Sequence, residues 1–168
     1  MRVPTVPRRR LARIRPVPVL VVAIVLAAAV ALAGWYADRR ASQRDQAVRQ
    51  ALATAPAAAK ALFSYDYRTF DDSVANGRTF AAGAFADEYA QTTTALKQTA
   101  TKQQAVVLAE VSATGVISAD PDRVELLLYL NQYRRNVTTA GEKVDQNRVV
   151  LTMAPVDGEW KVIKATAI

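Results

Sequence analysis

The 168-residue sequence contains no cysteine and no histidine. These two absences exclude a disulfide framework, a Cys or His zinc site, a thiolate nucleophile and a Ser-His-Asp triad. The length allows one domain of ordinary size with a tail, but not two full cores. We therefore expect a protein that is not an enzyme and that has no catalytic residues, no cofactor and no metal site.

Basic charge is concentrated at the start of the chain. The net charge is +7, and residues 1–15 contain six arginines and no acidic residue. The remaining residues carry 16 basic and 15 acidic side chains, a balance of +1. A nearly neutral body has no wide basic face for phosphates, so we expect no nucleic acid among the partners.

An apolar run without charged residues follows this basic tail. Residues 17–36 are apolar apart from Pro18, Gly34 and the aromatic pair at the end, and as a helix they extend about 30 Å, one hydrocarbon core. Trp35 and Tyr36 are typical of a membrane interface, and the preceding arginines favour a cytoplasmic N-terminus. The pattern predicts a single-pass protein of the cell membrane with residues 37–168 outside the cytoplasm.

A cleaved signal peptide is the alternative interpretation of the same segment. The basic start, the apolar run and Ala31-Leu32-Ala33 before Gly34 satisfy a small-residue cleavage rule. The apolar run is longer than the apolar region of a signal peptide usually is, so we favour the uncleaved anchor.

The chain divides by composition into a cytoplasmic basic tail (1–16), a transmembrane helix (17–36), an alanine-rich juxtamembrane helix (37–56) and an external α+β domain (57–168). The alanine-rich segment is a strong helix former with a thin apolar stripe, so it needs a partner or its own domain to pack against. Pro56 is expected to break or kink this helix.

Three further helical segments are expected, at 57–65, 67–79 and 81–102. In the second, Asn76-Gly77 is expected to act as the stop. In the third, four residues recur at helical spacing and predict a stripe that faces the core: Phe85, Tyr89, Thr92 and Leu96.

After Gln104 the apolar period changes from helical spacing to two. Asp120-Pro121-Asp122 predicts a turn, and Asp157-Gly158 is a strong hairpin signal. Strands are expected on both sides of these turns, with a further strand through Val149, Leu151 and Met153. The predicted fold is α+β, with helices packed on a four-stranded antiparallel sheet.

One polar cluster stands out as a candidate site for a ligand or a partner. Tyr65 and Tyr67 flank Asp66, and two phenols could donate hydrogen bonds to a ligand oxygen while the carboxylate takes a proton. The alternative, which we favour, is that the tyrosines pack at a helix junction while Asp66 or Arg68 caps or pairs on the surface.

Several segments together resemble the Mce-associated membrane proteins of mycobacteria and related actinobacteria. The similarity runs in the family's order from about Ala51 to Val162. The residues that carry it are Ser64-Tyr65-Asp66-Tyr67-Arg68-Thr69, Gly83-Ala84-Phe85, Tyr89-Ala90-Gln91, Gly115-Val116-Ile117-Ser118-Ala119-Asp120-Pro121-Asp122-Arg123, Asn131-Gln132, Asp145-Gln146-Asn147-Arg148-Val149 and Val156-Asp157-Gly158-Glu159-Trp160.

This resemblance implies a single-pass membrane protein whose external domain has the cone-shaped nuclear-transport-factor-like fold, also seen in the inner-membrane scaffold protein of type IV secretion systems. It further implies an accessory role in assembling or stabilising Mce complexes, which move lipids through the envelope. The implied partners are Mce subunits, the permease and the ATPase. The family defines no catalytic residues at these positions.

Three hypotheses follow for the function. The first is an interaction protein that is anchored by residues 17–36 and binds envelope subunits through its external domain. The second is a lipid- or steroid-binding protein that holds its ligand in the concavity of the domain, with Tyr65, Asp66 or Tyr67 at the polar end. The third is an enzyme that uses the same cavity. Self-association and the particular Mce system stay open.

Overall fold

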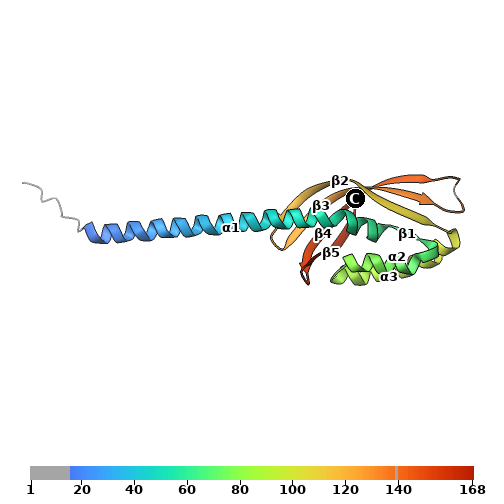
Figure 1. Cartoon of the computed structure of the whole chain (residues 1–168), viewed down its shortest axis with the longest axis horizontal. Helices are drawn as coiled ribbons and strands as arrows, with labels where there is room; N and C mark the ends of the chain where they lie inside the picture. Colours follow the sequence, from blue (N-terminus) through green and yellow to red (C-terminus); the bar gives the residue numbers. More distant parts are fainter. Residues whose placement is uncertain (1–15, 139) are drawn as a thin grey trace, which may run out of the picture. The chain divides into compact units, whose positions relative to one another are not determined.

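The computed structural model describes residues 16–138 and 140–168, so the predicted basic tail, up to residue 15, lies outside the described residues. The chain divides into two compact units with a boundary between Arg39 and Arg40. The first helix, α1 (Pro16–Phe63), contributes its beginning to the first unit and its remainder to the second (Figure 1).

The first part of α1 exposes apolar side chains along its length. Leu20, Val25 and Leu32 are all more than half exposed, as are Trp35 and Tyr36 at the end of the run. In the part of the chain that the structure describes, one helix is long and apolar enough to cross a membrane, with a mean hydropathy of 2.4 over a window of which nothing is buried. The Arg39 guanidinium lies 5.4 Å from the Trp35 ring centre.

The second part of α1 packs on the external domain and does not break at Pro56. The helix continues to Phe63, so the expected break is wrong. Pro56 is exposed, while Ala55, Ala58 and Ala59 are fully buried in the core cluster. Tertiary packing of this alanine face stabilises the helix against the hydrogen bond that proline removes. The second compact unit runs from Arg40 to Ile168 and so includes this part of the helix.

Three short helical segments follow: η1 (Tyr67–Thr69), α2 (Phe70–Phe80) and α3 (Ala84–Gln103). Gly77 does not end α2, contrary to the expected stop, because it lies inside the helix and is buried. A Cβ atom on Gly77 would lie 2.1 Å from the Tyr89 hydroxyl oxygen and 3.0 Å from the Ala61 carbonyl oxygen. This glycine therefore permits close packing of α2 against α3 and α1.

Five antiparallel strands form one sheet in the order of the chain. They are β1 (Tyr65–Asp66), β2 (Val106–Asp120), β3 (Arg123–Arg135), β4 (Lys143–Val156) and β5 (Glu159–Ala167). The predicted α+β fold is confirmed. The four strands that the sequence predicts correspond to β2, β3, β4 and β5. The additional edge strand, β1, pairs with Val106 and Val107 and is too short to show an alternating pattern.

Both predicted turns are present. Pro121 and Asp122 form the turn between β2 and β3, and Asp157 and Gly158 form the turn between β4 and β5. Asp157 and Gly158 have φ values of 53° and 82°. Two consecutive positive φ angles match the tight hairpin turn that this dipeptide favours.

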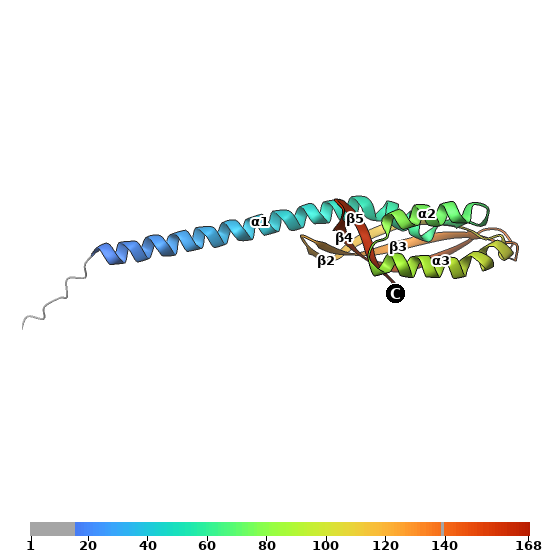
Figure 2. The ribbon, with the colours of Figure 1, turned by 90° about the horizontal axis from the view of Figure 1, so that it is seen from below.

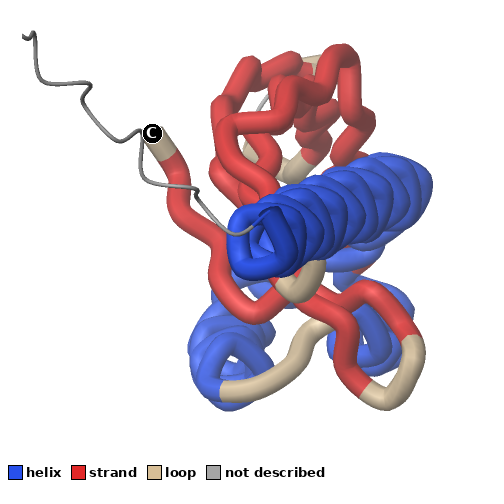
Figure 3. The backbone as a smooth tube through the Cα atoms, turned by 90° about the vertical axis from the view of Figure 1, so that its left-hand side faces the viewer, coloured by secondary structure: helices blue, strands red, loops and turns tan. Residues whose placement is uncertain are grey.

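The core of the external domain lies between one face of the sheet and the helices. Figures 1 and 2 show α2 and α3 side by side on the side of the twisted sheet to which α1 also contributes its last turns. Figure 3 separates these helices from the strands by colour. The most deeply buried large side chains come from β3, β4 and β5: Val124, Leu126, Leu128, Leu130, Leu151, Met153 and Val162.

Candidate functional site

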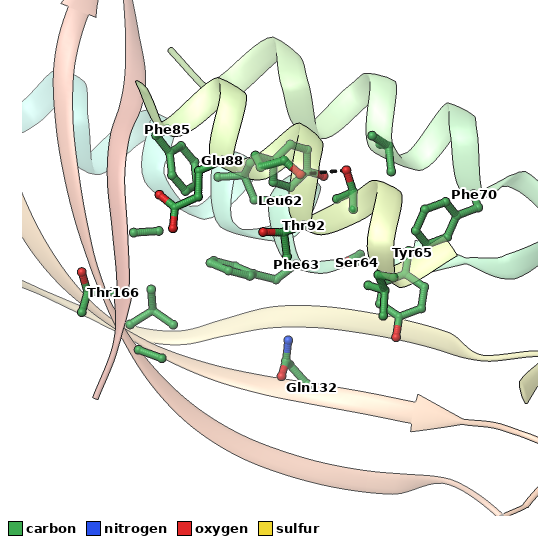
Figure 4. Close-up of a pocket in the computed structure, with 17 residues that line it drawn as sticks. Leu62, Phe63, Ser64, Tyr65, Phe70, Phe85, Glu88, Thr92, Gln132 and Thr166 are labelled. Atoms are coloured by element: carbon green, nitrogen blue, oxygen red, sulfur yellow. Dashed lines mark hydrogen bonds between the residues drawn. The ribbon is translucent and has the colours of Figure 1, made fainter. Parts of the chain in front are cut away.

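A partly open cavity of about 370 Å³ lies between the helices and the sheet of the external domain (Figure 4). The end of α1 contributes Leu62 and Phe63, α2 contributes Phe70, and β4 contributes Val149. The walls are mostly apolar. A volume of this order is within the range of pockets that hold small molecules.

One side of α3 forms a wall of this cavity. The four residues of the predicted stripe, Phe85, Tyr89, Thr92 and Leu96, all line it. Phe85 and Tyr89 are buried, whereas Thr92 is exposed, so the expectation that Thr92 faces the core is wrong. The buried threonine is Thr93, whose hydroxyl donates to the Tyr89 carbonyl oxygen at 2.8 Å. Phe85 and Tyr89 belong to the core cluster as predicted, and the stripe also borders the cavity.

Two polar residues on the walls were not predicted as site residues. Glu88 follows Phe85 by one helical turn, and Gln132 occupies the next inward position of β3 after Leu128 and Leu130. Figure 4 shows the Glu88 carboxylate beside Phe85 on the helical side and the Gln132 amide apart from it on the strand side. Glu88 is exposed to solvent, and the Gln132 side-chain oxygen accepts a hydrogen bond from the Asn147 side-chain nitrogen at 2.6 Å. For Gln132 the signal is a polar residue at a position where the period of two in β3 predicts a buried apolar one. Glu88 lies outside the predicted stripe and is exposed, so the period gives no signal for it.

Tyr65 is the one member of the predicted cluster that lines this cavity. Its ring packs edge-on against Phe70, with 5.5 Å between the ring centres. Burial raises the pKa of the Tyr65 hydroxyl, while the nearby Arg134 charge acts in the opposite direction. The side chain is therefore a neutral phenol that can donate one hydrogen bond.

Asp66 is held by its neighbour Arg68 and does not line the cavity. One carboxylate oxygen accepts hydrogen bonds from the Arg68 backbone nitrogen at 2.9 Å and from its Nε at 3.0 Å. These bonds lower the pKa of the Asp66 carboxyl. An ionised carboxylate paired in this way caps η1, which agrees with the favoured structural interpretation.

Tyr67 neither lines the cavity, as Tyr65 does, nor takes part in the hydrogen bonds between Asp66 and Arg68. Its backbone nitrogen donates to the Ala105 carbonyl oxygen at 3.1 Å, and the Arg68 guanidinium lies 5.9 Å from its ring centre. Tyr67 is absent from the residues that line the cavity. Tyr65 and Asp66 both line a second, more open pocket next to the end of α1, and Tyr67 begins η1. The proposal that the three residues form one ligand or partner contact stays a prediction.

Within residues 16–138 and 140–168, no group of three acidic side chains is arranged to hold a metal ion. Among the described residues that line the cavity, Glu88 is the one charged side chain, and no lysine or arginine is present. The cavity is thus an apolar space with a few neutral polar groups and one carboxylate.

The sequence matches no family model. It is 30% identical over 159 residues to the uncharacterized protein Rv1362c of Mycobacterium tuberculosis strain H37Rv, and equally to the uncharacterized protein MT1407 of strain CDC 1551. The match covers 92% of the chain and 72% of each relative. The chain belongs to the family of these mycobacterial proteins.

Three solved structures share the fold. The periplasmic domain of DotI has a TM-score of 0.58 and 12% identity, covering 68% of the chain and 89% of that domain. CagV, a VirB8 homolog of the type IV secretion system from Helicobacter pylori, has a TM-score of 0.57 and 10% identity, covering 68% and 93%. An IcmL-like type IV secretion system protein from Legionella pneumophila has a TM-score of 0.57 and 18% identity, covering 68% and 88%. The external domain has a VirB8-like, nuclear-transport-factor-like fold.

Proposed function

We propose that the chain is a membrane-anchored accessory protein that assembles or stabilises an Mce-type lipid-import complex through its external domain. The observation that supports this proposal most directly is that one chain combines a membrane-spanning type of helix with a domain of known fold. An exposed apolar helix long enough to cross a membrane precedes a domain with the VirB8-like fold.

The solved structures with this fold support an extracytoplasmic place for the domain. The DotI domain is periplasmic, and CagV and the IcmL-like protein belong to type IV secretion systems. Residues 17–36 then anchor the chain, with the N-terminus in the cytoplasm as the positive-inside rule requires. The Mce assignment depends on the sequence resemblance and on the mycobacterial relatives.

The state of Asp66 argues against its use as a general base. A general base that works near neutral pH needs a raised pKa, whereas the hydrogen bonds from Arg68 lower the pKa of this carboxyl. The mechanism is then mass action, because binding to the folded form of a partner lowers the free energy of that form and slows its loss.

Affinity purification of the tagged full-length chain from its native membrane in mild detergent tests the proposal. Mass spectrometry should find Mce subunits, the permease or the ATPase in amounts comparable to the bait. Deletion of the chain should also lower the steady-state level of those proteins. Purification without any Mce component, together with unchanged Mce levels after deletion, would refute the proposal.

Three variants separate binding from folding and from chemistry. Leu128→Asp buries an unpaired charge and should abolish co-purification by unfolding the domain, since Leu128 is fully buried. Tyr129→Asp introduces the same charge one residue away on the exposed face and should leave the domain folded. Asp66→Asn should leave partner levels unchanged, and loss of the partners in a folded Asp66→Asn variant would contradict a purely structural role for this residue.

A further inference from the structure

Two polar groups on the strand side of the cavity can donate hydrogen bonds. The Gln132 side-chain oxygen accepts a hydrogen bond from the Asn147 side-chain nitrogen at 2.6 Å, so the Gln132 nitrogen is the atom left to bind a ligand. Figure 4 shows this nitrogen on the side of Gln132 that faces the helices, and it shows the Tyr65 hydroxyl pointing towards the strands. Tyr65 is a neutral phenol, because burial raises the pKa of its hydroxyl. Both groups suit a ligand whose polar end accepts hydrogen bonds.

Two cationic side chains lie in the same cross-strand row as Tyr65. Strand pairing places Tyr65 opposite Val107, Val107 opposite Arg134, and Arg134 opposite Lys143. Directly paired residues point to the same face of a sheet. Because Tyr65 lines the cavity, Arg134 and Lys143 lie on the cavity face, next to the wall residues. The Arg134 charge accordingly acts on the Tyr65 hydroxyl.

One carboxylate is shared between these two cations. The Asp145 carboxylate oxygens lie 2.6 Å from an Arg134 guanidinium nitrogen and 3.6 Å from the Lys143 Nζ. Two positive charges and one negative charge leave a surplus of one positive charge. The carboxylate on the cavity wall, Glu88, lies away from Tyr65 in Figure 4. An anionic group on the ligand would therefore be attracted to the Tyr65 end of the cavity and repelled from the Glu88 end.

We infer that this cavity binds an apolar carboxylic acid whose carboxylate accepts hydrogen bonds from Tyr65 and Gln132 beside the Arg134 charge. The apolar chain of the acid lies against the walls formed by α1, α2, α3 and the sheet. Such a site is mostly apolar and orients its ligand by a few polar groups. Binding here does not depend on any protein partner, so its failure can be distinguished from failure of the scaffold proposal.

Photo-crosslinking of the full-length chain in nanodiscs of zwitterionic lipid tests the inference. The probes are a 12-carbon carboxylic acid and a 12-carbon alcohol, each with a diazirine at the same chain position, so that they differ only in the head group. Peptide mapping at a pH that ionises the acid should locate its adducts on segments that line the cavity. Labelling of these segments by the alcohol should be lower by about tenfold, because hydrogen bonds to a charged group are the stronger ones.

Arg134→Gln and Arg135→Gln form a matched pair that tests the charge. Arg134→Gln removes the charge on the cavity face, so it should lower acid labelling towards the alcohol level and leave alcohol labelling unchanged. Arg135 points to the opposite face of β3 and pairs with Glu142 at 2.7 Å, so Arg135→Gln should change neither. Tyr65→Phe removes the hydroxyl but keeps a ring against Phe70, and it should also lower acid labelling.

A second matched pair on β5 tests the space. Ala165 lines the cavity, whereas Lys164 is exposed and does not line it. Ala165→Trp fills the cavity and should abolish labelling of its walls by both probes. Lys164→Trp adds the same side chain outside the cavity and should leave labelling unchanged.

Equal labelling by the acid and the alcohol in the unmodified chain would overturn the inference. Unchanged acid labelling in a folded Arg134→Gln variant would also overturn it, as would adducts confined to residues 17–36, which would place the probes in the bilayer alone. Circular dichroism of each variant checks that the domain stays folded. If Ala165→Trp unfolds the domain, the comparison of Arg134→Gln with Arg135→Gln still decides the outcome.

Discussion

Gly77 is a position at which adding a single methyl group should change the stability of the domain. In Gly77→Ala the new Cβ would lie 2.1 Å from the Tyr89 hydroxyl oxygen, 2.8 Å from its Cζ and 3.0 Å from the Ala61 carbonyl oxygen. The Ala61 oxygen is backbone of α1, so the buried Tyr89 ring has to move. Overpacking of this kind destabilises a core by about 1–3 kcal/mol.

Helix propensity acts in the opposite direction at the same residue. Replacing glycine by alanine inside a helix stabilises it by about 1 kcal/mol. We therefore expect Gly77→Ala to lower the free energy of unfolding by up to about 2 kcal/mol, after this gain is subtracted from the overpacking cost. Gly115→Ala is the control, because its Cβ would have no neighbour within 4 Å.

Tyr89→Phe provides a specific rescue. It removes the oxygen that makes the 2.1 Å contact, and the structure shows no hydrogen bond from this hydroxyl to another described residue. The double variant Gly77→Ala/Tyr89→Phe should recover part of the lost stability, with a coupling of about 0.5–1 kcal/mol.

Urea unfolding of the full-length chain measures these differences. Trp160 in the domain is buried and serves as the fluorescence probe when Trp35 is replaced by Phe. If Gly77→Ala were more stable than the unmodified chain by the full propensity gain, or if Tyr89→Phe gave no rescue, Tyr89 could not lie against Gly77 as described.

Three other predictions concern the core, the cap and one long-range contact. Leu128→Ala should lower the free energy of unfolding by about 2–5 kcal/mol, because it leaves a cavity at a fully buried position; urea unfolding that shows less than 1 kcal/mol would contradict this. Hydrogen bonds from Arg68 lower the pKa of Asp66 from its ordinary value of 3.8, so its stabilising contribution is present above that value and is lost as the pH falls through the lower, folded-state value. Acid unfolding followed from pH 5 downwards should be less steep in Asp66→Asn, and an identical acid profile would rule out this linkage. The Trp160 indole donates to the Gln50 side-chain oxygen at 2.8 Å, so a double-mutant cycle with Trp160→Phe and Gln50→Ala should measure a coupling of about 1 kcal/mol, whereas additive effects would show that the bond contributes nothing.

The candidate site could be predicted from the sequence only in part. The spacing of Phe85, Tyr89, Thr92 and Leu96 identified one wall correctly as a set of residues on one side of a helix. The spacing did not show which part of that side packs in the core, as Phe85 and Tyr89 do, and which part borders a cavity. That distinction depends on how far the opposing strands lie from α3, which no local pattern encodes.

The proposed cluster of Tyr65, Asp66 and Tyr67 shows a different limit. Adjacency along the chain is informative about a site only when the backbone conformation is known. Here Tyr65 lines the cavity between the helices and the sheet, Asp66 pairs with Arg68, and both residues line a second pocket. Glu88 and Gln132, which are far apart in sequence, both line the first cavity.

By itself the sequence determined the apolar helix, the change of period from helices to strands, and the turns at Pro121-Asp122 and Asp157-Gly158. Each of these follows from side-chain chemistry within a short window. Tertiary structure decided that the helix passes through Pro56, that β1 forms and that a cavity remains between α3 and the sheet. These features depend on contacts between residues distant in sequence, whose energies outweigh local preferences.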